Sequence, residues 1–256
     1  MILSRVIKHV KEQHRTAVFL DFVVVVLGVF VGLQAQDWNQ ARQDRIRERA
    51  YLVRIRADLQ ADIDGLNQRE QYWNEVAENG KLALGYAETG ALANGSAWRT
   101  VLSFFEASEI WLYAPTDTAF KEMTSAGDLS LVRNETLRAA LSGYYNDSSK
   151  LARSTVYTEV PAYRNTVRGV TPFFVSDYII KNCNTRGPGN QHTIACKAPI
   201  SDAQAETILN SYLQKPHLVD DLRAWMTNLD LLEDGAADDL AVAKTLAAQV
   251  DKELTR

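Results

Sequence analysis

Cysteine and histidine are the side chains best suited to nucleophilic or metal chemistry, and this chain has few of either. Its two cysteines, Cys183 and Cys196, flank a Gly-Pro-Gly sequence at residues 187–189. Because that sequence is typical of a turn, we expect the two sulfurs to meet in a disulfide. The alternatives are two free thiols or a zinc site, for which His192 is the only nearby further ligand. A disulfide indicates an oxidising compartment such as a periplasm.

The four histidines are placed poorly for catalysis. His9 and His14 precede an apolar segment, and neither His192 nor His217 has a second histidine three or four residues away. The sequence contains no nucleophile elbow, zinc-protease, phosphate-loop or dinucleotide-binding motif. We therefore predict that the protein is not an enzyme and has no cofactor or metal site.

Two charged runs remain as candidate binding residues. The acidic run near the C-terminus lacks the oxygen spacing of a calcium loop, so a solvated helix face is the favoured interpretation. Its members are Asp230, Glu233, Asp234, Asp238 and Asp239.

The second run is a cluster of arginines between residues 42 and 56. Arg42, Arg45 and Arg49 are candidate contacts for anionic lipid headgroups or an acidic partner. Ion pairs within the same helix, with Asp44, Glu48 and Asp58, are the alternative interpretation.

An apolar segment precedes this cluster. Residues 17–33 read AVFLDFVVVVLGVFVGL, which is roughly 26 Å of helix at 1.5 Å per residue. Its flanking residues extend it to nearly the thickness of a bilayer core. We predict a transmembrane helix over residues 16–36, with Trp38 as its interfacial anchor. A cleaved signal peptide is the alternative, but the segment is long and no A-x-A site follows it.

Three residues of this segment suggest contacts with a partner helix. Gly28 and Gly32 form a G-x-x-x-G pattern, which allows two helix backbones to approach closely. Asp21 lies about one turn inside the segment, where its carboxylate either reaches the headgroups or pairs with a basic group of a partner.

The positive charges around the segment predict its orientation. Within ten residues of the apolar stretch, three basic residues precede it (Lys8, Lys11 and Arg15) and one, Arg42, follows it. When the count is extended as far as Arg56, four basic residues precede the segment and six follow it, which reverses the balance. The nearer charges and the expected disulfide favour a cytoplasmic tail at residues 1–15 and a periplasmic domain at 37–256, in a bacterial inner membrane.

The remaining sequence predicts a mainly α protein. Apolar residues spaced three, four or seven apart run from Leu52 to Val76, and a second such stripe begins at Leu218. We expect the transmembrane helix to continue to about Glu78, with Gly80 ending it, and a separate helix over 81–89. The first and last long helices should be neighbours in an antiparallel helical bundle.

Shorter helices are expected between these two. Ser96, Asn134 and Ser201 are predicted N-caps. The helix after Asn134 should continue past Leu151 and Val156 to Val167 with a kink at Pro161, and residues 172–180 fit either a strand or a helix.

The overall charge argues against nucleic acid as a partner. The 256 residues carry a formal net charge of −4, and 46% of them are hydrophobic. Nucleic-acid binding proteins present a basic face to the phosphates, whereas this composition is that of a folded acidic protein.

Two stretches resemble the bacterial domain of unknown function 6090 family. The first is residues 28–40, GVFVGLQAQDWNQ, followed by Arg42, Tyr51-Leu52 and Asp58-Leu59. The second runs from Phe120 to Tyr145 and includes GDLSLV at 127–132. The resemblance covers about residues 15–150. The chain departs from the family pattern at Gly32, where alanine is usual, and in the cysteine loop. The resemblance implies a single-pass membrane-anchored topology and no assigned activity.

These observations favour a non-enzymatic, membrane-anchored subunit or scaffold. Its expected partners are membrane lipids and either another membrane protein or further copies of itself. The alternative is a sensory or small-ligand-binding helical bundle, which would have to act through a partner because a tail of 15 residues cannot form an output domain.

Overall fold

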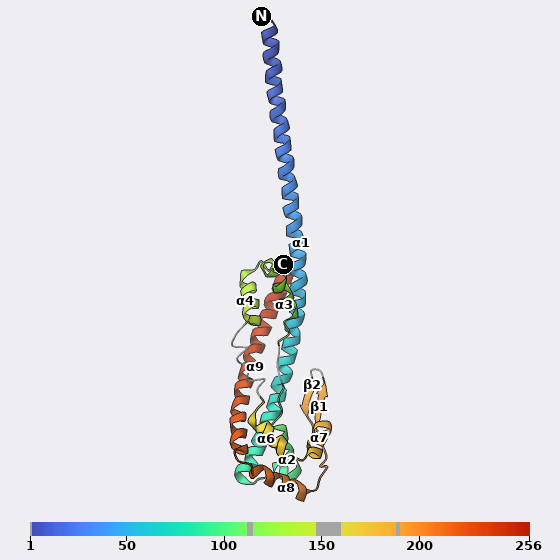
Figure 1. Ribbon diagram of the computed structural model, residues 1–256, viewed down its shortest axis with the longest axis vertical. Helices are drawn as coiled ribbons and strands as arrows, with labels where there is room; N and C mark the ends of the chain where they lie inside the picture. Colours follow the sequence, from blue (N-terminus) through green and yellow to red (C-terminus); the bar gives the residue numbers. More distant parts are fainter. Residues whose placement is uncertain (1, 112–114, 147–159, 188–189) are drawn as a thin grey trace.

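One helix, α1 (Ile2–Thr89), runs through the length of the structure (Figure 1). The computed structural model describes residues 2–111, 115–146, 160–187 and 190–256, with the backbone alone for residues 2–18, Asp21, Arg186 and Asn190. The N-terminal part of α1 projects from the rest, and its C-terminal part packs in a helical bundle (Figure 1). This confirms the predicted mainly α fold, in which an apolar N-terminal helix continues into a bundle.

The second long helix, α9 (Leu218–Leu254), lies antiparallel along α1, as predicted (Figure 1). Two ion pairs fix their direction. Arg56 of α1 contacts Asp251 near the end of α9 at 2.9 Å, and Glu88 near the end of α1 contacts Arg223 near the start of α9 at 3.1 Å.

The predicted apolar stripes of both helices form the core of the bundle. Burial of each large side chain stabilises the fold by about 1.5–3 kcal/mol. The buried residues include, from α1, Leu52, Ile55, Leu59, Leu66, Trp73 and Val76 and, from α9, Leu218, Leu222, Trp225, Leu229, Leu232, Leu246 and Val250.

The predicted end of the first helix was wrong. α1 passes through Gly80 and includes residues 81–89, which were predicted as a separate helix. Gly80 is buried, and a Cβ added there would collide with Met226 Sδ of α9. Its small size therefore allows α9 to pack closely on the α1 backbone. The residue that ends α1 is Gly90, whose φ of +75° is a conformation that favours glycine.

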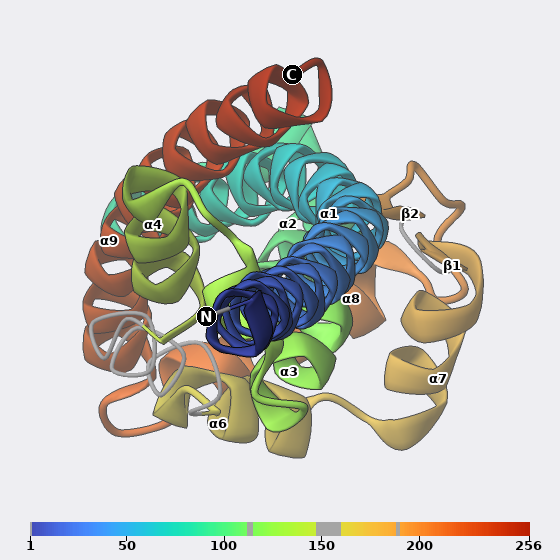
Figure 2. The same cartoon turned by 90° about the horizontal axis from the view of Figure 1, so that it is seen from above.

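Shorter elements surround the two long helices. Figure 2 shows α4 and α9 on one side of α1, and α7 with the strands β1 and β2 on the other. The elements are η1 (Ala93–Gly95), α2 (Ala97–Glu106), α3 (Thr118–Ser125), η2 (Asp128–Leu131), α4 (Glu135–Asn146), α6 (Ala162–Val170), α7 (Phe173–Asn182), β1 (Asn184–Gly187), β2 (Asn190–Thr193) and α8 (Asp202–Leu213).

Local signals predicted most of these elements. Ser96 and Ser201 accept hydrogen bonds from the backbone of the helices they precede, and Asn134 Oδ1 accepts one from Leu137 N. Pro161 directly precedes α6, while the predicted path through Leu151 and Val156 lies outside the described residues.

The ambiguous segment at 172–180 is helical, and the antiparallel pair β1–β2 was not predicted. Short polar strands such as NTRG and NQHT carry no apolar alternation by which a strand is recognised.

Candidate functional site

The projecting part of α1 exposes a long apolar surface. Apart from the half-buried Val23, its large apolar side chains from Phe19 to Leu33 are 48 to 65% exposed. The helix is long and apolar enough to cross a membrane, and none of its most apolar stretch is buried by the rest of the protein. Exposed apolar patches of this extent in soluble proteins mark sites of contact with a membrane or a partner. This segment is therefore a candidate membrane span.

The predicted helix-packing residues lie in this exposed part. Gly28 and Gly32 have no atom within 4 Å of the position a Cβ would occupy, so their backbone is open to a neighbour. Trp38 follows the span and is 64% exposed. The side chain of Asp21 lies outside the described part of the structure, so its predicted role stays a prediction.

The arginines after the span differ in their contacts. Arg47 makes the intrahelical ion pair that the alternative interpretation predicted, at 2.8 Å from Asp44, and this hydrogen bond lowers the pKa of the carboxyl. Arg49 instead donates a hydrogen bond of 2.6 Å to the carbonyl of Leu254, at the end of α9. The side chains of Arg42 and Arg45 make no ion pair or hydrogen bond with any described residue, which leaves them available.

Arg45 and Arg49 line a cavity of about 290 Å³ where α1 leaves the bundle, which we call the exit cavity. Three parts of the chain form it: α1, the turn between η2 and α4, and the C-terminal end of α9. The lining residues are Arg45, Glu48, Arg49, Leu52, Arg133, Glu253, Leu254 and Arg256.

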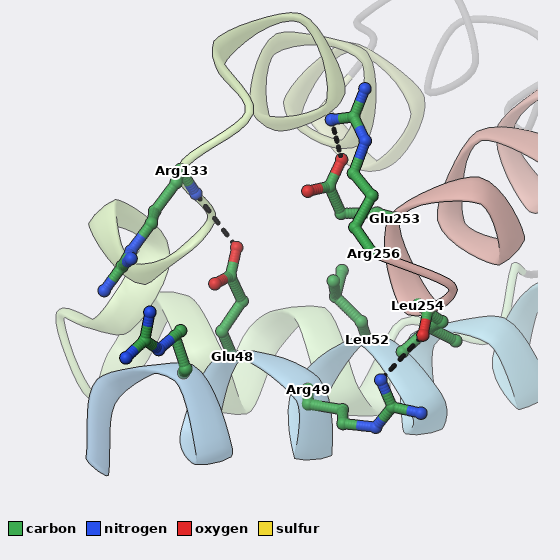
Figure 3. Close-up of a pocket in the computed structure, with 8 residues that line it drawn as sticks. Glu48, Arg49, Leu52, Arg133, Glu253, Leu254 and Arg256 are labelled. Carbon is green, nitrogen blue, oxygen red and sulfur yellow. Dashed lines mark hydrogen bonds and ion pairs between the residues drawn. The ribbon is translucent and has the colours of Figure 1, made fainter. Parts of the chain in front are cut away.

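Hydrogen bonds hold the walls of the exit cavity together (Figure 3). Glu48 accepts a bond of 3.0 Å from the backbone N–H of Arg133. On the other wall, Glu253 accepts bonds from Asn134 Nδ2 at 2.8 Å and from Arg256 Nη1 at 3.0 Å. Figure 3 shows Leu52 between these two walls.

Sequence reasoning missed Arg133, Glu253 and Arg256 as members of this site. They are more than eighty residues from Arg45 in sequence. Glu253 and Arg256 reach the site because α9 returns antiparallel to α1, and Arg133 because the segment before α4 bonds to Glu48 of α1. No local pattern could have indicated this convergence.

The cysteines form the predicted disulfide, Cys183–Cys196. It closes the base of the β1–β2 hairpin, and Glu75 of α1 holds the hairpin from the other side. The Glu75 carboxylate accepts a hydrogen bond of 2.8 Å from Thr193 N. It also lies 2.8 Å from His192 Nδ1. His192 therefore contacts the carboxylate of Glu75.

Replacing both cysteines with serine is expected to lower the free energy of unfolding by about 3 kcal/mol, because the crosslink no longer restricts the unfolded chain. Thermal unfolding monitored by circular dichroism, with and without reductant, measures the effect. The native chain should lose stability on reduction, while the Cys183→Ser/Cys196→Ser variant should not respond. Equal stability of the oxidised and reduced native chains would contradict the prediction.

The acidic run on α9 is less solvated than predicted. Asp239 is 4% exposed and Glu233 is half-buried, which corrects the expectation of a fully solvated face. Among the described residues, no three His, Cys, Asp or Glu side chains are grouped in a way that could hold a metal ion. Burial, followed by the charge of the neighbouring Asp230, raises the pKa of Glu233.

The variant Glu233→Gln is therefore expected to be more stable at neutral pH, by less than about 1 kcal/mol since the group is partly solvated. A carboxyl with a raised pKa in the folded state destabilises the fold once it is ionised, above that pKa. As the pH falls to the ordinary glutamate value of about 4.3, the native chain regains this stability. Chemical unfolding of both proteins at pH 7 and pH 4 should show a difference in the free energy of unfolding that becomes smaller at pH 4. An equal difference at the two pH values would contradict the prediction.

A second cavity, of about 350 Å³, lies between α2 and the residues that follow β2. Arg99 and Glu106 are its charged lining residues, and burial lowers the pKa of the Arg99 guanidinium. Trp98 also lines it, and the buried indole nitrogen of this residue has no hydrogen-bond partner among the described residues. The lining further includes the apolar side chains of Leu102 and Ile194.

No family model, curated protein or solved structure matches this chain. The resemblance to the domain of unknown function 6090 family therefore stays a prediction.

Proposed function

We propose that this protein is a non-enzymatic, membrane-anchored subunit or scaffold of the bacterial inner membrane. Its N-terminal tail lies in the cytoplasm and its helical bundle in the periplasm, where the bundle associates with other membrane proteins or with further copies of the chain.

The observation that carries this proposal is the continuity of α1. One helix without a break contains both the exposed apolar segment and the buried core residues from Leu52 to Val76. A helix is stiff, so the bundle keeps a defined distance and direction from whatever holds the apolar segment. Such a rigid connection suits a scaffold that holds its bundle at a fixed place relative to the membrane. A flexible linker would not hold the bundle in this way.

Two further features support the membrane location and the compartment. An apolar helix with all its backbone bonds made internally is the form in which a single segment crosses a bilayer. The disulfide Cys183–Cys196 persists in an oxidising compartment, which for an inner-membrane protein is the periplasm.

The open backbone at Gly28 and Gly32 supports association within the membrane. Small residues on one helix face allow a partner helix to approach closely, since lipid gives no hydrophobic drive for helix association. The partner surface would then be the face of α1 that carries both glycines.

Crosslinking in native membranes, followed by purification and mass spectrometry, tests the proposal. The variant Gly28→Leu/Gly32→Leu keeps the segment apolar and blocks close approach. Val26→Leu/Phe30→Leu, on the opposite helix face, is the matched control. We expect a defined partner, or a crosslinked oligomer, that the glycine variant loses and the control keeps. A chain that always elutes alone as a monomer would contradict the proposal.

A second candidate function, a small-ligand-binding module that acts through a partner, is favoured by the cavity beside α2. Its volume of about 350 Å³ lies within the range of roughly 300–1,000 Å³ usual for ligand pockets. The half-buried cation of Arg99 favours a carboxylate on the ligand, and the buried carboxylate of Glu106 in the same lining favours a cationic group beside it, as in an amino acid. A thermal-shift screen of small carboxylates tests it: a stabilising compound should lose its effect on Arg99→Ala.

A further inference from the structure

One face of α1 stays exposed from the candidate membrane span well into the bundle. Successive residues of an α-helix are about 100° apart around its axis. By this spacing, a set of exposed residues lies within about 30° of one line along α1. We call this set the α1 stripe, and its members are Gly28, Gly32, Ala35, Asn39, Ile46, Ala50, Val53 and Ala57. All of them except Asn39 are small or apolar, and none is charged.

The α1 stripe lies on the side of the helix that faces away from the core. The buried residues Leu52, Ile55 and Leu59 are about 150° around the axis from it. Figure 1 shows α3, α4 and α9 together on one side of α1 in the upper part of the bundle. Ile46 and Val53 are therefore 60% and 52% exposed. A second helix has room to approach this side without meeting the bundle.

The part of the stripe within the bundle has the spacing of a helix-pairing surface. Ile46, Ala50 and Val53 are four and three residues apart, and Ala57 follows after four more. Two helices that pack side by side in a coiled coil contact each other at this spacing. Arginines flank the stripe, but each of three has a carboxylate of its own chain as a partner. The pairs are Arg47–Asp44 at 2.8 Å, Arg54–Glu122 at 2.9 Å and Arg56–Asp251 at 2.9 Å.

The length of the stripe indicates which partner can cover it. Ala57 lies 22 residues beyond Ala35, the end of the apolar segment, which is about 33 Å of helix. A partner that contacts both Gly28 and Ala57 must itself be a helix that crosses the bilayer and continues unbroken for this distance. α1 has this form. Copies of one chain insert in the same orientation, so their α1 helices run parallel.

A two-fold axis between two such helices places the stripe of one copy on the same stripe of the other. We propose that the partner of this protein is a second copy of the chain, packed along the α1 stripe with both bundles on the outside. This inference rests on the membrane anchoring proposed above and names the partner. In the pair, the Asn39 side chains meet, and each amide can donate a hydrogen bond to the carbonyl of the other.

The β1–β2 hairpin limits how far the contact extends. The line of the stripe continues to Glu75, which accepts a hydrogen bond of 2.8 Å from Thr193 N of the hairpin. Two hairpins would collide if the helices stayed in contact at this height. α1 is curved in Figure 1, with its convex side away from α9, as helices that wrap around a core usually are. Two helices that meet on their convex sides separate beyond the contact, so the interface ends before the hairpin.

Cysteine crosslinking of the full chain in native membranes tests this pairing. The variants Ile46→Cys and Val53→Cys each place a thiol where a residue faces its own counterpart. The two native cysteines are paired with each other, so the added thiol is free to react. Arg45→Cys is the matched control, because it is exposed and adjacent to Ile46 in sequence but lies about 100° away around the helix. Copper phenanthroline oxidises neighbouring thiols, and mass spectrometry identifies each product.

We expect Ile46→Cys and Val53→Cys to give at least about tenfold more covalent dimer of this chain than Arg45→Cys, because a disulfide requires its two Cβ atoms to come within about 4.5 Å. The proposal is overturned if neither variant forms the dimer or if Arg45→Cys forms as much. Crosslinks to a different protein would also overturn it, while the membrane-anchored scaffold would stand. Failure of the scaffold proposal is a separate result, since the chain would then be absent from the membranes before crosslinking.

Discussion

The variant Glu109→Ala is expected to have a free energy of unfolding about 3–5 kcal/mol lower than that of the native chain, because it leaves two arginines without their buried counter-charge. Glu109 is 2% exposed. Its carboxylate lies 2.7 Å from Arg168 Nη2 and 3.4 Å from Arg164 Nη1. Burial and the neighbouring Arg168 already lower the pKa of Arg164, so removal of the carboxylate would leave a costly pair of cations between α2 and α6.

Chemical unfolding of the detergent-solubilised chain, followed by circular dichroism, measures this loss. Glu135→Ala is the matched control, because among the described residues Glu135 makes only a loose ion pair, at 3.7 Å from Arg138, and its side chain is 86% exposed. The control should change the free energy of unfolding by less than about 0.5 kcal/mol. A Glu109→Ala variant as stable as the control would show that the buried ion pairs contribute little.

The variant Asp62→Ala is expected to lose about 3 kcal/mol of stability, because two hydrogen bonds to a buried carboxylate disappear together. Asp62 is 2% exposed. Its Oδ1 accepts from Thr116 N at 2.7 Å, and its Oδ2 accepts from the hydroxyl of Tyr144 at 2.9 Å. The carboxylate thus joins α1 to α4 and to the residues that precede α3.

Asp64→Ala is the control for this second prediction. Asp64 lies on the same helix, is exposed, and accepts a hydrogen bond only from Gln60 among the described residues. The same unfolding measurement should separate the two variants by more than about 2 kcal/mol. Nearly equal unfolding midpoints and denaturant slopes for the two variants would mean that water takes over the hydrogen bonds of the lost carboxylate.

Periodicity predicted the long helices well, because the burial of α1 and α9 repeats at helical spacing. It did not predict which glycine ends α1. The sequence around Gly80 and Gly90 does not separate their roles. In the structure Gly80 packs against Met226, whereas Gly90 has a positive φ and ends the helix. α9 likewise passes through the buried Gly235 without a break.

Polar residues were harder to place than apolar ones. A carboxylate usually lies on the solvent side of a helix, yet Asp62 of α1 is buried. Its neighbour Asp58 accepts a hydrogen bond of 3.0 Å from Ala119 N at the start of α3. Periodicity describes the average polarity of a helix face and carries no information on which carboxylate finds partners in another element. The exit cavity was unpredictable for the same reason, since its lining residues come from parts of the chain that meet only in the folded protein.

We propose that the apolar segment of α1 is embedded in a membrane and holds the bundle there. Extraction of native membranes with alkaline carbonate tests it most directly, because this treatment releases proteins bound by charge and retains those whose apolar helices cross the bilayer. We predict that the full-length chain stays in the membrane pellet. Release of the intact chain into the supernatant, or a mature chain that begins beyond residue 36, would contradict the account.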